Sequence, residues 1–229
     1  MKIVLLSPAG REFSERVRVV APDADVVLPT DEAASVAAVA DAEVILGSVP
    51  PREVFQAAKK LRWFQTVSAG MDRLFKIPEL KEGDFKLTNS SGLHGTQVAE
   101  LAWAFTLALF KQIPAFSRAQ SSREWGKEEH RPKDISGATV GIVGFGGIGR
   151  QFAKRALAFE MRVLAVDTQP SSKPENIEAL WGINRLDDLL READLLFLAC
   201  PHTPDTNKLI DARALRIMKK SAFLVNTAR

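Results

Sequence analysis

Three glycines in the pattern G-x-G-x-x-G place the strongest constraint on what this chain can fold into. The motif runs from Gly144 to Gly149, follows the apolar run 140–143 and precedes a helical pattern over residues 150–159. In this context Gly144 allows a tight turn, Gly146 lets the backbone approach a pyrophosphate, and Gly149 lets the helix pack closely on the strand. The first amide groups of such a helix bind anions. The pattern therefore predicts a strand, a phosphate-binding loop and a helix that together hold a dinucleotide.

An acidic residue lies at the position where a dinucleotide site of this kind has a carboxylate. Residues 162–166 form a predicted strand that ends in Asp167, close to the expected distance of about 20 residues after the last glycine. Its carboxylate can accept hydrogen bonds from an adenosine ribose and would repel a 2′-phosphate by about 1–4 kcal/mol at contact. NAD is therefore favoured over NADP, although Lys173 is near enough in sequence to weaken the preference. The alternative is an ordinary strand-to-helix turn with a solvated Asp167.

Short apolar runs alternate with helical patterns along the rest of the chain, which is typical of a parallel α/β sheet. Strands are predicted at residues 3–6, 44–46 and 63–67, and again at 139–143, 162–166, 195–199 and 222–225. Helices are predicted at residues 32–40 and 52–58. We expect two domains, over residues 1–95 and 96–229.

A longer helix is predicted at the start of the second domain, over residues 96–111. Thr96 is its expected N-cap, and Pro114 marks the end of the pattern. Its apolar side chains fall on one stripe at helical spacing, made of Val98, Leu101, Ala102, Phe105, Ala108 and Leu109. The polar stretch 112–137 is expected to connect this helix to the second domain's strands.

Composition excludes several classes of protein. The chain has 31 Lys and Arg against 28 Asp and Glu, a formal net charge of +3, which is too small to indicate a nucleic-acid partner. Its one cysteine, Cys200, forbids an internal disulfide and suits a reducing compartment. The longest apolar segment, 101–110, is far short of a bilayer span, and the apolar run after Lys2 is too short for a signal peptide. We expect a cytoplasmic protein with no membrane partner.

Two further segments carry candidate ligand-binding groups. Ser68, Ala69 and Gly70 follow a predicted strand, and Met71 begins what looks like a helix. The amides of Ala69 and Gly70 would form a small cradle for a carboxylate. A turn that merely uses a glycine explains the segment equally well.

The last predicted strand ends in polar residues, among them Asn226 and Arg229. Ligands of doubly wound sheets lie at the carboxyl ends of strands, so these side chains would lie beside a cofactor. An arginine offers a rigid fork for a carboxylate or a carbonyl oxygen. The alternative is a solvated terminal arginine.

In their order along the chain, these motifs resemble the NAD-dependent D-2-hydroxyacid dehydrogenase family, which includes phosphoglycerate dehydrogenases and glyoxylate/hydroxypyruvate reductases. The resemblance covers essentially the whole chain and is carried by residues 67–72, 92–100, 143–149, 167, 200–209 and 226–229. It implies a flavodoxin-like substrate domain hinged to a Rossmann-type cofactor domain with a doubly wound parallel sheet. It also implies an active site in the cleft and a homodimer joined through the cofactor domain and the helices around the hinge.

The resemblance assigns roles residue by residue. Ser68, Ala69 and Gly70 match the loop that holds the substrate carboxylate. The matching cofactor contacts are Gly147 and Ile148 at the pyrophosphate, Asp167 at the ribose, Cys200 and Pro201 beside the adenosine, and Val98, Thr227, Ala228 and Arg229 beside the nicotinamide. Arg229 matches the catalytic arginine, which holds the 2-oxo acid and polarises its carbonyl group. No metal site is implied.

The implied activity is the interconversion of a D-2-hydroxy acid and a 2-oxo acid with NAD(H). The family's catalytic Glu and general-acid His lie beyond its arginine, and this chain stops at Arg229, so we expect the 229-residue chain to be impaired. We expect the substrate domain to lack its C-terminal returning helix and the cofactor domain to be truncated after the strand ending near Asn226.

Two other hypotheses fit these motifs. One is a non-catalytic NAD-binding interaction protein, since the family includes corepressors. The other is a truncated piece that is unable to complete either function. Among the three histidines, His94 at the hinge either approaches the cleft or is an ordinary loop or capping residue. His202 is expected near the adenosine, and His130 lies in a charged linker.

Overall fold

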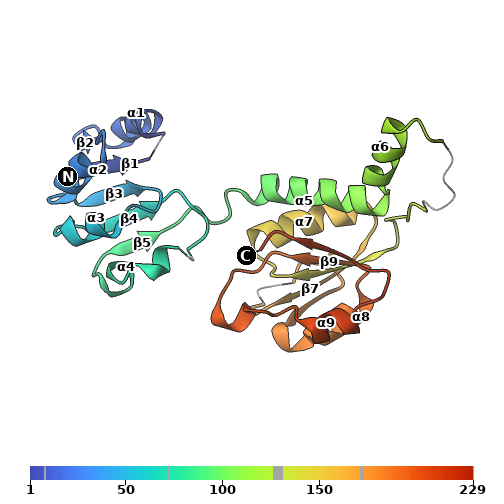
Figure 1. Cartoon of the computed structure of the whole chain (residues 1–229). Helices are drawn as coiled ribbons and strands as arrows, with labels where there is room; N and C mark the ends of the chain where they lie inside the picture. Colours follow the sequence, from blue (N-terminus) through green and yellow to red (C-terminus); the bar gives the residue numbers. More distant parts are fainter. Residues whose placement is uncertain (8, 72, 126–130, 171–172, 229) are drawn as a thin grey trace. The chain divides into compact units, whose positions relative to one another are not determined.

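The chain forms two compact units, Met1–Ser91 and Gly92–Arg229, each built on its own parallel sheet (Figure 1). The computed structural model describes all residues except Pro8, Asp72, residues 126–130, Ser171, Ser172 and Arg229. The division falls before the boundary expected at residue 95, because the turn at Gly92 packs on Gly147 of the second unit. Within the part of the chain that the structure describes, every helix is too short or too polar to span a membrane.

The sheet of the first unit has the strand order β2-β1-β3-β4-β5, which is that of flavodoxin-like folds. Its strands, all parallel, are β1 (Lys2–Leu6), β2 (Asp25–Val27), β3 (Val44–Gly47), β4 (Trp63–Thr66) and β5 (Lys86–Thr88). The predictions of β1, β3 and β4 and of the fold class are confirmed. Strands β2 and β5 were not predicted, because three residues are too few to establish a pattern.

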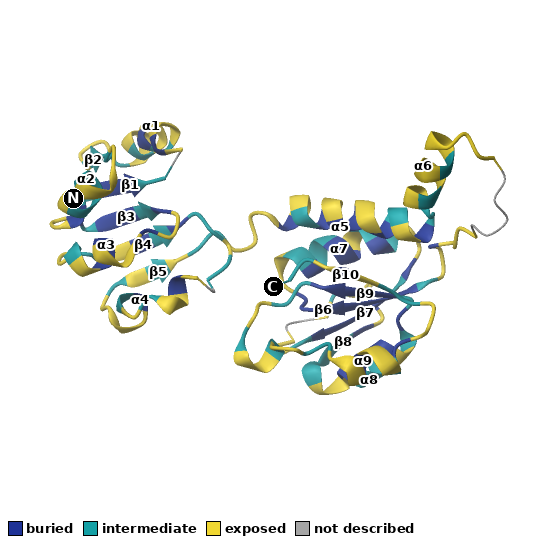
Figure 2. Cartoon of the chain, viewed as in Figure 1, coloured by how far each residue is buried: buried dark blue, intermediate teal, exposed yellow. Residues whose placement is uncertain are grey.

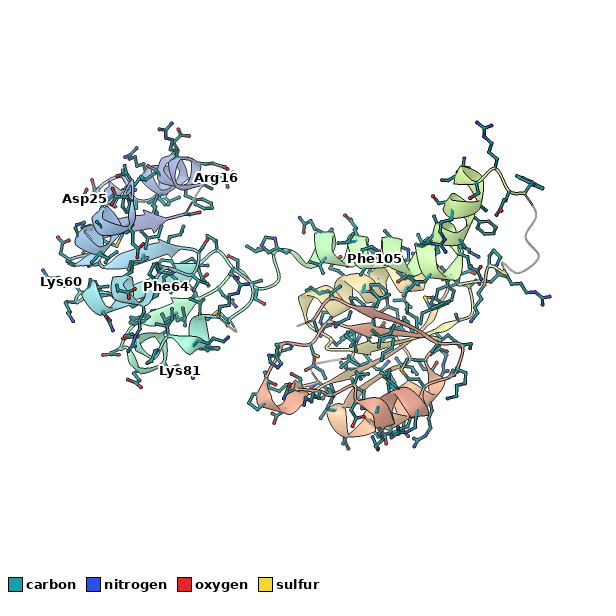
Figure 3. The ribbon with its side chains drawn as sticks, in the orientation of Figure 1. Arg16, Asp25, Lys60, Phe64, Lys81 and Phe105 are labelled. Carbon is teal, nitrogen blue, oxygen red and sulfur yellow. The ribbon has the colours of Figure 1, made fainter. Side chains whose placement is uncertain are left out.

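Alternate side chains of the first sheet pack on different helices. Val4 joins the cluster formed with α2 (Glu32–Val39), α3 (Arg52–Ala57) and α4 (Glu79–Glu82), which also contains the fully buried Phe64 labelled in Figure 3. Its neighbours Ile3 and Leu5 face the other way and pack on α1 (Gly10–Val20). This period of two is the pattern of a strand buried on both faces.

The helix start expected at Met71 is absent from the described residues. The chain there makes a single 3-10 turn, Leu74–Lys76, followed by the short helix α4. Pro78 stands before α4 and, since it lacks an amide hydrogen, it cannot continue the hydrogen-bond ladder of the turn before it.

The second sheet has the order β10-β9-β6-β7-β8, which read from β8 is the 3-2-1-4-5 order of a Rossmann fold. Its parallel strands are β6 (Thr139–Val143), β7 (Arg162–Asp167), β8 (Ala179–Gly182), β9 (Leu195–Leu198) and β10 (Phe223–Asn226). Four of the five were predicted. The predicted Rossmann-type sheet is confirmed.

Helices α5 (Gly95–Phe110) and α7 (Gly147–Ala158) cover one face of the second sheet, and α8 (Leu186–Glu192) and α9 (Ala212–Ile217) cover the other (Figures 1 and 2). Phe152 of α7 stacks on Phe197 of β9 with ring centroids 3.9 Å apart. This contact packs α7 on β9, the neighbour of the strand β6 that precedes the glycine motif.

The buried face of α5 differs from the predicted stripe. The helix buries Gly95, Ala99, Ala102, Trp103, Thr106 and Phe110. Leu101, Phe105 and Leu109 of the predicted stripe are instead 58%, 54% and 36% exposed. Packing against α7 determines which face of α5 is buried, because Trp103 packs between the rings of Phe152 and Phe159. The expected N-cap was also wrong: α5 begins at Gly95 after His94, which makes no side-chain capping bond.

A further helix, α6 (Ile113–Ser121), occupies part of the stretch expected to be a connection. Gln112 separates it from α5 with a left-handed backbone, φ 54°. Pro114 stands in the first turn of α6, where a missing amide hydrogen costs nothing. Pro114 therefore belongs to the start of α6, and α5 has already ended at Phe110.

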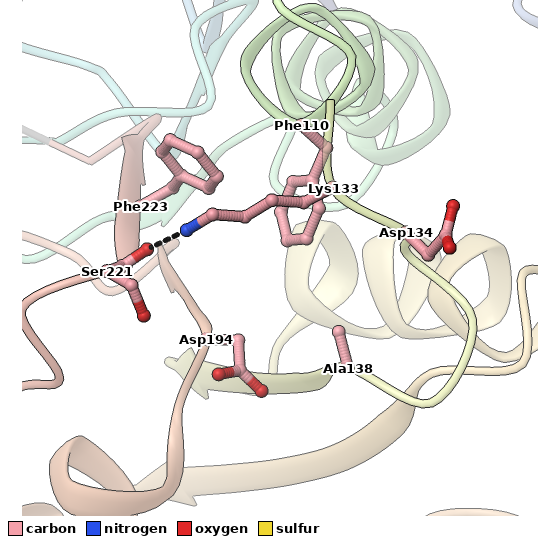
Figure 4. A pocket seen from close by; sticks show the side chains of 7 residues that line it. All are labelled: Phe110, Lys133, Asp134, Ala138, Asp194, Ser221 and Phe223. Atoms are coloured by element: carbon pink, nitrogen blue, oxygen red, sulfur yellow. Dashed lines mark hydrogen bonds between the residues drawn. The ribbon is translucent and has the colours of Figure 1, made fainter. Parts of the chain in front are cut away.

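At the amino-terminal edge of the second sheet, side chains line a hollow of about 380 Å³ (Figure 4). Lys133 Nζ donates a hydrogen bond to Ser221 O at 2.9 Å and lies 4.9 Å from the ring centroid of Phe223. Asp194 accepts hydrogen bonds from Thr139 N at 2.9 Å and Lys219 Nζ at 2.8 Å. Burial alone would raise the pKa of Asp194, but these two donors hold that pKa below its usual value.

Replacing Asp194 with Ala is expected to lower the free energy of unfolding by about 1–3 kcal/mol at pH 7, because it removes an acceptor of one charged and one backbone hydrogen bond. The measurement is urea unfolding followed by tryptophan fluorescence. Since the pKa is lower in the folded state, the contribution is complete above the unfolded pKa near 4 and is lost as the pH falls through the folded value. The difference between Asp194→Ala and the wild type must therefore shrink below about pH 4.

The control is Asp134→Ala, which removes a carboxylate that is 94% exposed and pairs with Lys111 at the surface. This change should alter stability by less than about 0.5 kcal/mol. An Asp194→Ala penalty that is the same at pH 7 and at pH 3 would contradict the assignment.

Candidate functional site

The strands at the centre of the second sheet end level with one another. Their last paired residues are Val143 with Val166, Val143 with Leu198, and Leu198 with Asn226. Predicted cofactor residues lie at these strand ends or within two residues of them, at Gly144, Asp167, Cys200 and Thr227. The register continues past the strand ends, since Gly144 N donates to Val166 O at 2.9 Å and Thr227 N donates to Leu198 O at 3.0 Å. Segments far apart in the sequence thus meet at the carboxyl edge, where ligands of doubly wound sheets bind.

The three glycines of the motif are required for three different reasons. Gly144 has φ 91°, and a Cβ there would lie 2.6 Å from Cys200 N. A Cβ on Gly149 would lie 2.2 Å from Gly144 O, so α7 sits on the end of β6 only because Gly149 has no side chain. A Cβ on Gly146 would meet nothing within 4 Å. Gly146 thus borders open space, which is the requirement for a backbone that a pyrophosphate must approach.

Helix α7 presents its first amide groups to that space. Its N-cap is Gly146, and the amide of Arg150 is the first to bond back, to Gly146 O at 3.0 Å. The amides of Gly147, Ile148 and Gly149 belong to the first turn, which has no acceptor within its own helix. These donors and the open space at Gly146 fit a pyrophosphate at a helix N-terminus.

Asp167 is held in place by the phosphate loop itself. Its Oδ2 accepts a hydrogen bond from Phe145 N at 2.7 Å, and its Oδ1 accepts one from Gln169 N at 3.0 Å. Each carboxylate oxygen has a second lone pair, so the group can still accept hydrogen bonds from two ribose hydroxyls. Asp167 is half-buried, so the alternative of a solvated loop residue does not describe it.

A hollow of about 310 Å³ adjoins this carboxylate. Its walls are formed by Phe145, Gly146, Arg150, Asp167, Thr168, Gln169 and Leu180. Sequence reasoning named Asp167 and Gly146 but missed the others. The position of Arg150, immediately after the motif, was the available signal, whereas Leu180 lies on β8, a strand that was not predicted.

Cys200 lies behind the phosphate loop. It is half-buried, and its backbone nitrogen is the atom that a side chain on Gly144 would meet. Burial raises the pKa of the Cys200 thiol, and the charge of Asp167 raises it further. His202 lies with Nε2 3.3 Å from Asn207 Oδ1. The Cys200 thiol therefore has no features of an activated nucleophile.

The predicted nicotinamide contacts lie at two places on the same unit. Thr227 Oγ1 donates a hydrogen bond to Leu198 O at 2.9 Å, and Ala228 N donates one to Asn226 Oδ1 at 2.8 Å. Val98 is half-buried on α5, one turn after Gly95. A Cβ on Gly95 would lie 3.0 Å from Gly147 O. The contact of Gly95 with Gly147 brings the start of α5 to the phosphate loop.

The predicted catalytic residue Arg229 and the linker residue His130 lie outside the described residues. Pro201 and His94 are both exposed. Neither bears on the geometry of the phosphate loop. The roles assigned to individual residues therefore stay predictions.

In the first unit, the loop after β4 is held as a tight turn. Ser68 Oγ donates a hydrogen bond to Gly70 O at 3.2 Å, and Asn89 Nδ2 donates one to Ala69 O at 3.0 Å. None of the described residues accepts a hydrogen bond from the amide of Ala69 or Gly70. The turn thus keeps two donors available to a carboxylate, although no α-helix begins directly after it.

Comparison with protein families matches residues 103–229 to the NAD binding domain of the D-isomer specific 2-hydroxyacid dehydrogenases. The match covers more than half of the chain, and the chain belongs to this family. The predicted family and its cofactor domain are confirmed.

Individual relatives agree. The chain is 33% identical to a hydroxypyruvate reductase of Thermotoga maritima over 177 residues, which are 77% of this chain and 56% of that protein. It is 37% identical to a glyoxylate reductase of Thermococcus kodakarensis, over 77% of this chain and 55% of that protein. The chain thus spans about half the length of the curated relatives it matches.

A solved structure also shares the fold. It is a D-isomer specific 2-hydroxyacid dehydrogenase family protein from Aeromonas salmonicida, with a TM-score of 0.86 at 24% identity. The match covers 100% of this chain and 73% of that one. At this identity the likeness shows the fold alone.

Gly146 borders open space and Gly149 is in close contact with backbone, so alanine substitutions at the two positions should have different effects on NADH binding and stability. Gly146→Ala should leave stability unchanged, because its Cβ enters open space, and should weaken NADH binding about 10-fold or more by occupying the pyrophosphate position. Gly149→Ala should lower the unfolding free energy by about 2 kcal/mol or more, because its Cβ collides with backbone. The measurements are NADH titration by fluorescence and urea unfolding. Unchanged NADH affinity in a folded Gly146→Ala variant would contradict the site.

Proposed function

We propose that the full-length protein is an oxidoreductase that interconverts a D-2-hydroxy acid and the matching 2-oxo acid with NAD(H). The observation that carries the proposal is the meeting of the phosphate loop and Asp167 at one sheet edge, in a chain of this family. The names of its relatives favour a small substrate such as glyoxylate or hydroxypyruvate. The single cysteine, Cys200, suits a reducing compartment, and we assign the protein to the cytoplasm.

The second unit holds the cofactor. When bound, NAD(H) supplies or accepts the hydride. The amides of Gly147 and Ile148 bind the pyrophosphate, and Asp167 accepts hydrogen bonds from the ribose. Cys200 and Pro201 form the wall beside the adenosine, and Val98, Thr227 and Ala228 orient the nicotinamide. These roles are supported by the level strand ends and by the open space at Gly146.

The first unit and Arg229 hold the substrate. The amides of Ala69 and Gly70 bind the substrate carboxylate, in a turn kept in shape by Ser68 and Asn89. Arg229 orients the 2-oxo acid and stabilises the negative charge that develops on its carbonyl oxygen during hydride transfer.

The test follows NADH oxidation by the full-length protein with glyoxylate, hydroxypyruvate and larger 2-oxo acids. Arg229→Gln should lower kcat about 10²–10³-fold, because it removes a donor to the developing oxyanion. NADH affinity should change far less. A protein that binds NADH and reduces none of these acids would exclude the enzyme and favour a non-catalytic, NAD-dependent interaction protein.

We further propose that the protein is a homodimer joined through the cofactor domain. The support is the row of exposed apolar side chains on α5, formed by Leu101, Phe105 and Leu109 (Phe105 is labelled in Figure 3). They follow one another at a spacing of four residues and therefore form one stripe of the helix. A second copy presenting the same stripe would bury both.

Phe105→Glu is expected to convert the dimer to a monomer in sedimentation velocity, because two facing stripes would each receive a buried charge. NADH affinity should be retained, since Phe105 is not among the predicted cofactor contacts. The control is Leu215→Glu, a similarly exposed apolar residue on α9. Equal assembly of wild type and Phe105→Glu would remove α5 from the interface.

A further inference from the structure

The hollow beside Asp167 has a basic side chain as well as an acidic one. Arg150 contributes to the same wall as Asp167, Thr168 and Gln169. In a dinucleotide site this is the region of the adenosine ribose, where the 2′ position carries a hydroxyl in NAD(H) and a phosphate in NADP(H). The balance of charge at this place decides which of the two cofactors is accepted.

Arg150 is fixed at this wall by its neighbours. It follows Gly149 in the first turn of α7, and its guanidinium lies 4.8 Å from the ring centroid of the buried Phe145. Phe145 is in turn the residue whose amide holds Asp167. A cation over an aromatic ring is attracted to it and loses rotational freedom. The base and the acid are thus positioned by the same residue of the phosphate loop.

Lys173 does not fill this role, although its place in the sequence suggested that it would. Lys173 Nζ donates hydrogen bonds to Ile177 O at 2.8 Å and Pro174 O at 3.4 Å. These contacts lie within its own loop. Lys173 is also not among the residues that line the hollow in the described part of the chain.

Asp167 repels a phosphate less than an isolated carboxylate would. Both of its oxygens accept backbone amides, from Phe145 and Gln169. These donors stabilise the negative charge and offset part of its field. A guanidinium beside such a carboxylate can bind a phosphate with two parallel hydrogen bonds.

We propose that Arg150 determines cofactor choice by binding the 2′-phosphate, so that this site takes NADP(H) as well as NAD(H). The inference rests on the dinucleotide site of the proposed function. Asp167 then serves the 2′-hydroxyl of NAD(H), and Arg150 serves the 2′-phosphate of NADP(H). The two cofactors bind in the same place with different partners.

The test is to titrate the full-length protein separately with NADH and NADPH and follow nucleotide fluorescence. The wild type should bind both, with dissociation constants within about 10-fold of each other. Arg150→Gln should weaken NADPH binding about 10-fold or more, the loss expected for a charged hydrogen-bonded pair, and NADH binding less than about 3-fold. Lys173→Gln, which removes the same charge nearby in sequence, should change neither.

A second variant gives the opposite change. Asp167→Asn should weaken NADH binding and leave NADPH binding equal or stronger, because it removes the repulsion and keeps Arg150. Both variants are checked for folding by circular dichroism.

Each other outcome has a definite meaning. Equal weakening of both cofactors in Arg150→Gln would place the guanidinium against the adenine and overturn the proposal. Binding of NADH but not NADPH by the wild type would also overturn it and leave the dinucleotide site intact. Binding of neither would overturn the site and the proposal together.

Discussion

The close approach of α7 to the end of β6 is the contact on which the rest of the second unit depends. A Cβ on Gly149 would lie 2.2 Å from Gly144 O, so the helix can start at this point only without a side chain there. That start directs the amides of Gly147 and Ile148 to the open space at Gly146. The same loop supplies the Phe145 amide that holds Asp167, and Gly147 is the surface on which Gly95 of α5 packs.

The fold and the centre of the site could be predicted because local sequence patterns determine them. The glycine motif needs its strand and helix, and Asp167 needs only the end of the next strand. The buried face of α5 could not be predicted in this way. Leu101 and Phe105 are as apolar as Trp103 and Phe110, and the choice between them is made by Phe152 of α7, which is distant in sequence. The three-residue strands β2 and β5 were missed because they are too short to form a pattern.

The two basic residues near Asp167 illustrate the same limit. Lys173 is close to Asp167 in the chain, yet its ammonium is bonded to carbonyl groups of its own loop. Arg150 is farther away in sequence but lies on the wall of the hollow, since it follows Gly149 into the first turn of α7 and rests on Phe145. Charge at a binding site depends on where the backbone brings side chains together, and here the phosphate loop determines that arrangement.

The central claim is that the carboxyl edge of the second sheet is a dinucleotide site, and hydrogen exchange measured with and without NADH tests it most directly. NADH should slow amide exchange in peptides covering residues 144–150 and 167–169, where the phosphate loop and Asp167 lie. Peptides at the opposite edge, around Asp194 and Ser221, should be unaffected. Protection confined to that opposite edge, or no protection at a saturating NADH concentration, would contradict the account.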